Sequence, residues 1–270
     1  MSEREVKVVT PQREIDCYLA LPGGEGKHPA VIVIHEIFGP DAHIRDVARR
    51  FAAQGYVAAA PNLFTGEFQR TLTPENIALV MQAFAHAPPD LRRDPSKMAA
   101  FVASQPPERR PVLEVFGKIQ SPEMLASFAK DLYAVARYLG SLPEVDPRRI
   151  GSVGFCFGGG MSGRLATVDP ELRAAVIFYG QNPPIADVPK IHAAVLGLYG
   201  GEDPGITGTV PDLDAAMKAA GKRFEYHVYP GAKHAFFNDT RPSNHHPASA
   251  ADAWPRVLTF FDTYLRPPPG

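Results

Sequence analysis

A cysteine flanked by glycines is the strongest chemical signal in the sequence. Cys156 stands in the run GFCFGGG, residues 154–160, between an apolar strand-like stretch and a helix-like one. A nucleophile in a sharp strand-to-helix turn needs glycine neighbours, because larger side chains would clash with the approaching helix. The thiol would then stand at a helix N-terminus, where unpaired N–H groups favour a thiolate and a developing oxyanion. The run therefore predicts a nucleophilic cysteine.

Two other interpretations of this run stand beside the catalytic one. The first is a buried structural cysteine next to a glycine-rich turn. The second is a phosphate-binding loop of the form G-x-G-x-x-G, but position 156 is not glycine, so that motif does not fit. The choice between a nucleophile and a structural cysteine depends on whether a base and an acid accompany Cys156.

An acid and a histidine follow Cys156 in the order that hydrolases with this turn use. Asp203 lies in YGGEDP and His234 in PGAKHAF, each directly after an apolar strand-like segment. The carboxyl ends of strands form the functional edge of an open α/β sheet, so we expect Cys156, Asp203 and His234 to meet there. They would act as nucleophile, acid and base. Glu202 is the alternative acid, and the sequence does not separate it from Asp203.

A further polar loop follows the apolar run AVIVI, residues 30–34. It reads His35, Glu36, Ile37 and continues into Phe-Gly. In this architecture the corresponding loop supplies one backbone N–H of the oxyanion hole, which makes Ile37 the candidate donor. Glu36 is an unusual residue at such a place. Its simpler interpretation is a loop carboxylate paired with a neighbouring arginine.

The remaining cysteine and histidines give weaker signals. Cys17 lies on the apolar side of a predicted strand, so packing is its expected role. His245 and His246 could join His234 around a metal, but a solvated loop is the simpler interpretation. No H-E-x-x-H spacing is present among the nine histidines. The sequence therefore predicts no metal site.

Composition excludes several classes of protein. The 270 residues are 45% hydrophobic, which excludes a disordered chain, and 28 basic against 29 acidic residues argue against a nucleic-acid or anionic-membrane partner held by charge. Two cysteines are too few for a disulfide framework and indicate a reducing compartment. The first residues carry no apolar signal region, and no run is long enough to span a membrane. We expect a soluble, cytoplasmic protein of unknown oligomeric state.

The hydrophobic pattern predicts an N-terminal hairpin followed by alternating strands and helices. The predicted strands are Glu5–Thr10, Arg13–Leu21, Ala30–Ile34, Tyr56–Ala60, Ile150–Phe155, Ala174–Tyr179, Ala194–Tyr199 and Phe224–Tyr229. The predicted helices are Ile44–Ala52, Leu125–Leu139, Phe157–Val168, Asp212–Ala220 and Ala248–Leu265. We expect Gly55 and Gly140 to end two helices and Pro255 to shift or kink the last one. Continuous apolar strands indicate a mostly parallel sheet with helices on both faces, an α/β fold in one domain, residues 1–270.

The segment 65–120 interrupts this alternation. It contains seven prolines and one clear helical pattern, formed by Ile77, Val80, Met81 and Phe84. One interpretation is a surface excursion between two strands of the sheet. The other is a cap over a site, since long insertions in compact domains are often lids. We expect a cap insertion.

The chain resembles the dienelactone hydrolases, cysteine members of the α/β-hydrolase fold. The resemblance is carried by VIVIHEIFG, GYVAAAPNLF, GFCFGG, YGGEDP and YPGAKHAFFND, which are spread over most of the chain. It implies a triad of Cys156, His234 and Asp203. It also implies that Glu36 touches the resting thiol and helps to activate it when substrate arrives. Backbone N–H groups of Ile37 and Phe157 would form the oxyanion hole.

The predicted function is hydrolysis of small carboxylic esters or lactones through an acyl-thioenzyme, with a small-molecule substrate as partner and without metal or organic cofactor. A thioesterase or acyltransferase with the same triad is one alternative. A catalytically silent lactone-binding protein is the other. Arginines that could hold a substrate carboxylate are Arg92, Arg93, Arg109, Arg110 and Arg241.

Overall fold

A computed structural model describes residues 1–84 and 95–266 of the chain. The chain forms two compact units. One consists of Met1–Leu63 together with Ala129–Gly270, and the other is the continuous segment Phe64–Phe128. Arg92 and Arg93 lie outside the described residues.

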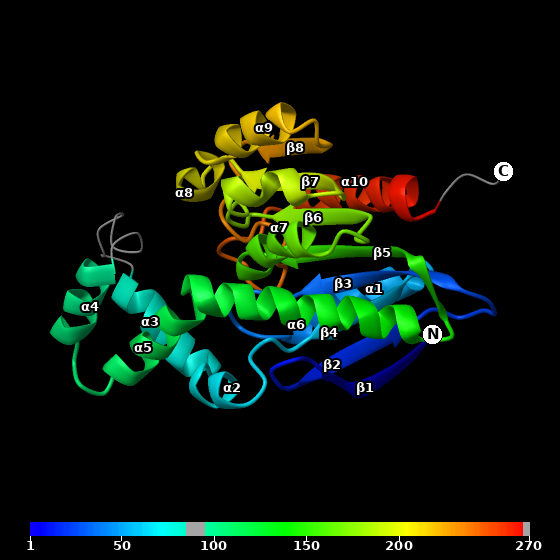
Figure 1. The fold of residues 1–270 in the computed structure, drawn as a ribbon. Helices are drawn as coiled ribbons and strands as arrows, with labels where there is room; N and C mark the ends of the chain where they lie inside the picture. The colour runs from blue at the N-terminus through cyan, green and yellow to red at the C-terminus, as the bar shows by residue number, and fades with distance from the viewer. Residues whose placement is uncertain (85–94, 267–270) are drawn as a thin grey trace. The chain divides into compact units, whose positions relative to one another are not determined.

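The larger unit is built on an eight-stranded sheet in the order β1-β2-β4-β3-β5-β6-β7-β8 (Figure 1). Its strands are β1 Ser2–Val9, β2 Glu14–Leu21, β3 His28–Ile34, β4 Val57–Pro61, β5 Val145–Phe155, β6 Ala174–Phe178, β7 Ala194–Gly200 and β8 Phe224–Tyr229. The pairs β1–β2 and β2–β4 are antiparallel, and every other neighbouring pair is parallel. The mostly parallel sheet is confirmed.

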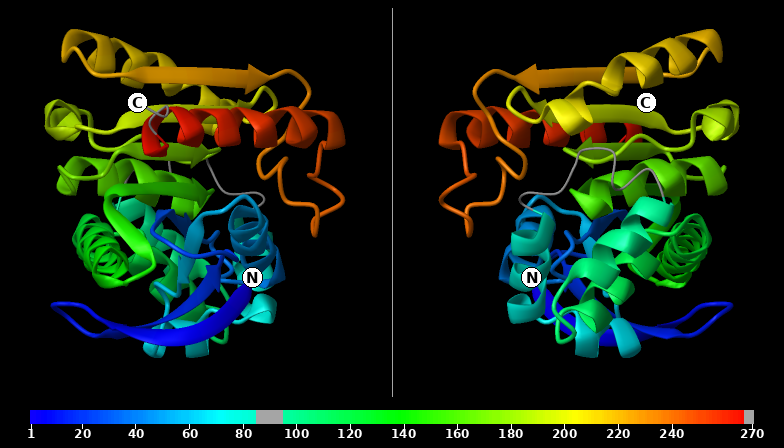
Figure 2. Two further views of the ribbon diagram at one scale, coloured as in Figure 1. Left: turned by 90° about the vertical axis from the view of Figure 1, so that its right-hand side faces the viewer. Right: turned by 90° about the vertical axis from the view of Figure 1, so that its left-hand side faces the viewer.

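Helices cover both faces of this sheet (Figure 2). The helices α1 Ala42–Ala53 and α10 Pro247–Leu265 pack on one face, where their apolar side chains join one large core cluster. The helix α7, Phe157–Val168, follows β5 in the chain. The short helix α8, Pro204–Thr207, follows β7, and α9, Val210–Ala219, follows α8. The helix α7 and α9 lie on the other face, together with residues 129–141 of α6 Pro122–Ser141. A 3-10 helix, Ile185–Lys190, follows β6.

The apolar runs explain why the central strands form. Every residue of β3 after His28 is buried, as are all residues of β4, β6 and β7. A strand buried on both faces must be apolar throughout, as the sequence predicts. The hairpin differs because β1 is largely exposed and pairs in register with β2, for example Val6 opposite Cys17. The alternation of polar and apolar residues in this hairpin reflects one face that is exposed to solvent.

Helix ends follow the expected local chemistry with one exception. The Asp41 side chain accepts the Ile44 N–H and caps α1, which ends just before Gly55 at φ 85°. Gly140 does not end its helix, because α6 continues to Ser141. The prediction for Gly140 was wrong by one residue. Pro255 lies inside α10, which extends without interruption from Pro247 to Leu265.

The smaller unit is more helical than its prolines suggest. It contains α2 Glu67–Thr71, α3 Pro74–Phe84, α4 Pro95–Ser104, α5 Arg110–Ile119 and the first residues of α6. The prediction of a single helical patch was wrong. Pro74, Pro111 and Pro122 stand in the first turn of their helices, where a missing N–H costs nothing. Its core includes aromatic contacts of Phe84 with Phe101 and Phe116.

Within the described part of the chain, no helix combines the length and the apolar character needed to cross a membrane.

Candidate active site

The turn around Cys156 has the strained geometry of a nucleophile held between strand and helix. Cys156 joins β5 to α7 with φ 55° and ψ −113°, a conformation that non-glycine residues rarely adopt. A Cβ atom on Gly154 would lie 1.8 Å from the Gly158 carbonyl oxygen, and one on Gly158 would lie 2.2 Å from the Ile34 oxygen. The two glycines are therefore required for the helix to approach the strands this closely. The Cys156 side chain remains partly exposed.

The structure brings His234 and Asp203 together. His234 Nδ1 lies 2.6 Å from Asp203 Oδ2. Asp203 follows β7 and His234 follows β8, so two neighbouring parallel strands deliver both residues to the same edge of the sheet. Glu202, the alternative acid, is exposed, whereas Asp203 makes the hydrogen bond to His234.

His234 interacts electrostatically with Cys156 as well as with Asp203. Burial alone would lower the pKa of His234. The charge of the Cys156 sulfur and hydrogen bonds with Asp203 and Cys156 outweigh burial and raise that pKa from 6.5 to about 11. This balance favours a protonated His234 imidazole.

One candidate oxyanion donor lies on the loop after β3 and the other at the N-terminus of α7, and these two segments pack together. Ile37 is buried in the loop after β3, and Phe157 is the first residue of α7. The first turn of α7 packs against the end of β3, since Gly158 has the Ile34 and His35 oxygens as its nearest neighbours. This packing sets the loop that carries Ile37 beside the N-terminus of α7.

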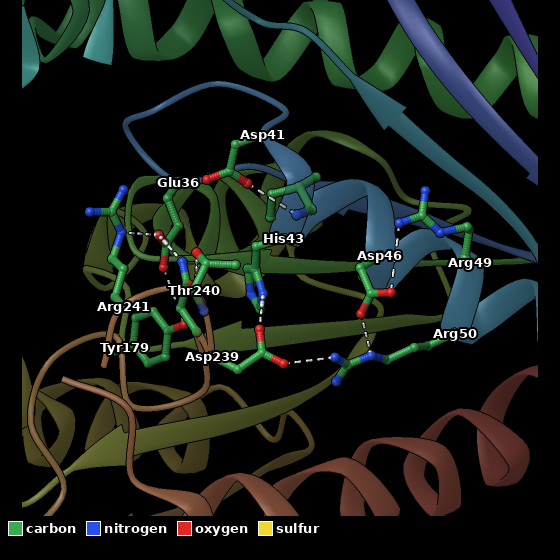
Figure 3. A network of polar contacts seen from close by, with 12 residues as sticks. Glu36, Asp41, His43, Asp46, Arg49, Arg50, Tyr179, Asp239, Thr240 and Arg241 are labelled. Carbon is green, nitrogen blue, oxygen red and sulfur yellow. Dashed lines mark hydrogen bonds and ion pairs between the residues drawn. The ribbon is translucent and has the colours of Figure 1, made fainter. Parts of the chain in front are cut away.

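Glu36 is held by a buried network rather than by the thiol. Tyr179 donates its hydroxyl to Glu36 Oε1 at 3.3 Å, and Asn238 donates its side-chain amide to Oε2 at 2.9 Å. Arg241 Nε lies 3.8 Å from Oε2 (Figure 3). Burial raises the pKa of Glu36, and Asn238 opposes that rise. Among the contacts of Glu36 in the described residues, Cys156 does not occur.

The candidate arginines fall in different places. Arg241 pairs with Glu36 and stacks 3.5 Å above the Phe38 ring, so it braces the loop that carries Glu36. The simpler interpretation of Glu36, a carboxylate paired with an arginine, thus agrees with the structure. Arg109 and Arg110 belong to the smaller unit, where Arg110 Nε donates to the Gln105 carbonyl oxygen.

Tyr179 and Asn238 are functional candidates that the sequence did not reveal. Tyr179 is buried at the end of β6, and its ring lies 5.2 Å from the His234 ring in an edge-to-face contact. It thus bridges the Glu36 network and the His234 pair. Three described non-glycine residues have positive φ, namely Cys156, Tyr179 and Ala235, and all three belong to this region. Backbone strain of this kind concentrates at functional sites.

Among the described residues, the second cysteine and the histidines show no second site. Cys17 is buried, and burial raises the pKa of its thiol, which leaves it unreactive. His246 bonds to Ser249 at the start of α10. Over residues 1–84 and 95–266, no group of three or more His, Cys, Asp or Glu side chains could hold a metal ion.

Comparison with known proteins places the chain in a family. The model of the dienelactone hydrolase family matches residues 15–265. The chain belongs to the dienelactone hydrolase family. A relative from Saccharolobus solfataricus, named "Putative carboxymethylenebutenolidase", is 38% identical over 261 residues, which cover 96% of this chain and 97% of the relative. A relative of the same name from Escherichia coli is 35% identical and covers 89% of this chain and 79% of its own length.

A solved structure agrees with this assignment. The crystal structure of a "Putative Dienelactone Hydrolase" from Klebsiella pneumoniae superposes with a TM-score of 0.73 and 31% identity. The match covers 97% of this chain and 99% of the Klebsiella chain. The chain is thus an α/β hydrolase and a carboxylic ester or lactone hydrolase, as the sequence predicts.

Proposed function

We propose that this member of the dienelactone hydrolase family cleaves small esters or lactones through a covalent acyl-thioenzyme on Cys156. The observation that supports the proposal most directly is the strained turn that presents Cys156 beside the hydrogen-bonded pair of His234 and Asp203. A nucleophile, a base and an orienting acid in this relation form the triad of nucleophilic hydrolases.

In the proposed acylation step, the Cys156 sulfur attacks the carbonyl carbon of the substrate. The π electrons of the carbonyl move to its oxygen, and the Ile37 and Phe157 N–H groups stabilise the negative charge. The tetrahedral intermediate then collapses, the C–O bond of the leaving group breaks, and protonated His234 gives its proton to the departing oxygen. For a lactone, the leaving hydroxyl stays attached to the acyl group.

In the proposed deacylation step, His234 takes a proton from water while the water oxygen attacks the thioester carbon. The C–S bond breaks, the carboxylic acid leaves, and the sulfur returns as the thiolate beside protonated His234. Asp203 holds the His234 ring in one tautomer and stabilises its cation. Each step uses only groups of the chain, the substrate and water.

Glu36 and the segment 65–120 complete the proposal. Glu36 restrains the resting Cys156 through its negative charge, while its hydrogen bonds run to Tyr179 and Asn238. The segment 65–120 acts as a cap insertion that sets substrate selectivity. A cytoplasmic location fits a nucleophile that must stay reduced.

Substitution of Cys156 tests the proposal. In Cys156→Ala we expect turnover of aryl esters and enol-lactones to fall about a thousandfold or more, the usual cost of removing a triad member. The matched control is Cys17→Ala, which removes the buried thiol and should keep the activity. Full activity of Cys156→Ala would overturn the proposal.

The same assays separate the alternatives. Transfer of the acyl group to an added alcohol or thiol in preference to water would indicate an acyltransferase. Preference for acyl thioesters would indicate a thioesterase. Binding of lactones without turnover in the wild-type protein would indicate a silent binding protein.

A further inference from the structure

His35, a buried histidine beside Glu36, takes no part in the proposed chemical steps. Its side chain is fully buried at the end of β3. The Leu63 backbone N–H donates to His35 Nε2 at 3.1 Å, and His35 Nδ1 lies 2.5 Å from the Glu36 carbonyl oxygen. Since a backbone N–H can only donate, Nε2 must be unprotonated. The ring proton is therefore on Nδ1, which donates to the Glu36 carbonyl.

The Glu36 carbonyl belongs to the same peptide group as the Ile37 N–H. A peptide group is planar, and this one is trans, so its C=O and N–H point in opposite directions. Whatever fixes the direction of the Glu36 carbonyl thus also fixes the direction of the Ile37 N–H. At one end of this peptide the Glu36 carbonyl accepts from His35 Nδ1 at 2.5 Å and more weakly from the Gly39 N–H at 3.3 Å, while the other end is the candidate oxyanion donor.

We propose that His35 is a positioning residue that aims the Ile37 N–H at the oxyanion through its hydrogen bond to the Glu36 carbonyl. The inference deepens the proposed function and rests on it, because Ile37 has a catalytic role only if an oxyanion forms. A hydrogen bond to a carbonyl also polarises its peptide group, which makes the N–H a stronger donor.

His35 also contacts the other half of the candidate oxyanion hole. Its ring stacks on the Phe157 ring, with centroids 6.0 Å apart and planes inclined by 23°. Phe157 supplies the second candidate N–H from the first turn of α7. Gly158 packs against the Ile34 and His35 carbonyl oxygens. Displacement of the loop after β3 would therefore move both candidate N–H donors.

The competing role for His35 is purely structural. Through Nε2 it ties the end of β3 to Leu63, directly after β4. Burial lowers the pKa of His35 to about 4, so the ring is neutral at neutral pH and both bonds persist. The two roles use different ring nitrogens and can be separated.

Two variants that replace His35 by a residue with a side-chain amide separate the two roles. The side-chain amide of Asn lies near the position of Nδ1 and can donate to the Glu36 carbonyl, so His35→Asn keeps the proposed aiming bond. The longer side chain of Gln places its amide near Nε2, so His35→Gln keeps the tie to Leu63. Each variant loses one of the two bonds.

Two rates are measured for each protein in its folded form, checked by circular dichroism. One is the pre-steady-state acylation of Cys156 by an aryl ester, which passes through an oxyanion. The other is alkylation of Cys156 by iodoacetamide, which does not. We expect His35→Gln to acylate about 10- to 100-fold more slowly than wild type, less than the loss of a whole oxyanion donor. His35→Asn should acylate at least about tenfold faster than His35→Gln, and all three should alkylate at similar rates.

Three results would overturn the inference. Equal acylation in the two variants, or faster acylation in His35→Gln, would leave His35 with only the structural tie. A parallel fall of acylation and alkylation would show damage to the thiol itself. If Cys156 of the wild-type protein is alkylated by iodoacetamide but is acylated by none of the esters, the proposed function is refuted, and the inference with it.

Discussion

At the scale of single residues, the site depends on buried polar groups whose charge is set by their neighbours. His35, Glu36 and Tyr179 are all buried within a few residues of a strand end. Burial lowers the pKa of His35, whereas the interactions of His234 with Cys156 and Asp203 outweigh burial and raise its pKa. The pKa values of these two histidines are thus shifted in opposite directions.

The buried His35 predicts a loss of stability in acid. The pKa of His35 is about 4 in the folded chain and 6.5 ordinarily. Between these pH values the histidine is protonated in the unfolded chain but not in the folded chain. The free energy of unfolding should therefore fall between pH 6.5 and pH 4, by about 3 kcal/mol from this residue. When urea unfolding is measured across that range, the free energy of unfolding should depend less steeply on pH in His35→Asn than in the wild type. The raised pKa of Glu36 acts in the opposite direction in both proteins. Identical slopes would refute the prediction.

Glu36 predicts a change in the reactivity of the thiol. A negative charge near the Cys156 sulfur disfavours the thiolate, so Glu36→Gln should be alkylated by iodoacetamide faster than wild type at neutral pH. The rate is followed across pH by mass spectrometry of the Cys156 peptide. Asp239→Asn is a control, because Asp239 pairs with Arg50 and His43 beside the same network. Equal rates in wild type and Glu36→Gln would leave Glu36 with the bracing role that its bond to Asn238 already shows.

At the scale of elements, the strands were predictable and the site's supporting contacts were not. The apolar runs of β3, β6 and β7 predict strands that are buried on both faces. Cys156 follows β5 and His234 follows β8, so the order of these strands in the chain sets the order of the two residues. Nothing local marks Tyr179 or Asn238, because their partner Glu36 lies more than 140 residues away in the chain. Such contacts arise only when the sheet is assembled.

The smaller unit has more helices than the one helical pattern that the sequence predicts. Several of its prolines begin helices, where the fixed φ of proline is an advantage. The sequence also leaves the acid of the proposed triad open between Asp203 and Glu202. Only the geometry distinguishes them, since Asp203 reaches His234 while Glu202 faces solvent.

The close approach of β5 and α7 predicts that Gly154 tolerates no side chain. In Gly154→Ala the new methyl group would overlap the backbone of Gly158, so the turn must open and the protein should lose more than about 4 kcal/mol of stability. Gly205→Ala is the matched control, because a Cβ there meets nothing within 4 Å. Urea unfolding compares the two variants. A Gly154→Ala protein as stable as wild type would contradict the packing described for the turn.

At the scale of the whole molecule, the chain forms two compact units, one built on the sheet and one helical. All groups of the proposed triad, both candidate oxyanion donors and the Glu36 network come from the larger unit. We therefore expect the chemistry to depend on that unit and the choice of substrate to depend on Phe64–Phe128.

Replacement of the basic pairs tests the second half of this expectation. If one of Arg92, Arg93, Arg109 and Arg110 binds a substrate carboxylate, the fourfold Arg→Ala variant should raise KM for an anionic lactone about tenfold or more, with kcat little changed. KM in the wild type should also rise with salt. A neutral ester is the control substrate and should show no change. An unaltered KM for the anionic lactone would show that these arginines do not bind the carboxylate.

The most direct test of the account is to trap the acyl group on the enzyme. Wild-type protein is mixed with an aryl ester, quenched in acid within the burst phase, digested and mapped by mass spectrometry. The account predicts one acyl group per chain, on the peptide that contains Cys156, with Cys17 unmodified because it is buried. His234→Ala should slow both formation and loss of the adduct. Turnover of the ester with no adduct on Cys156, or with the acyl group on another residue, would contradict the account.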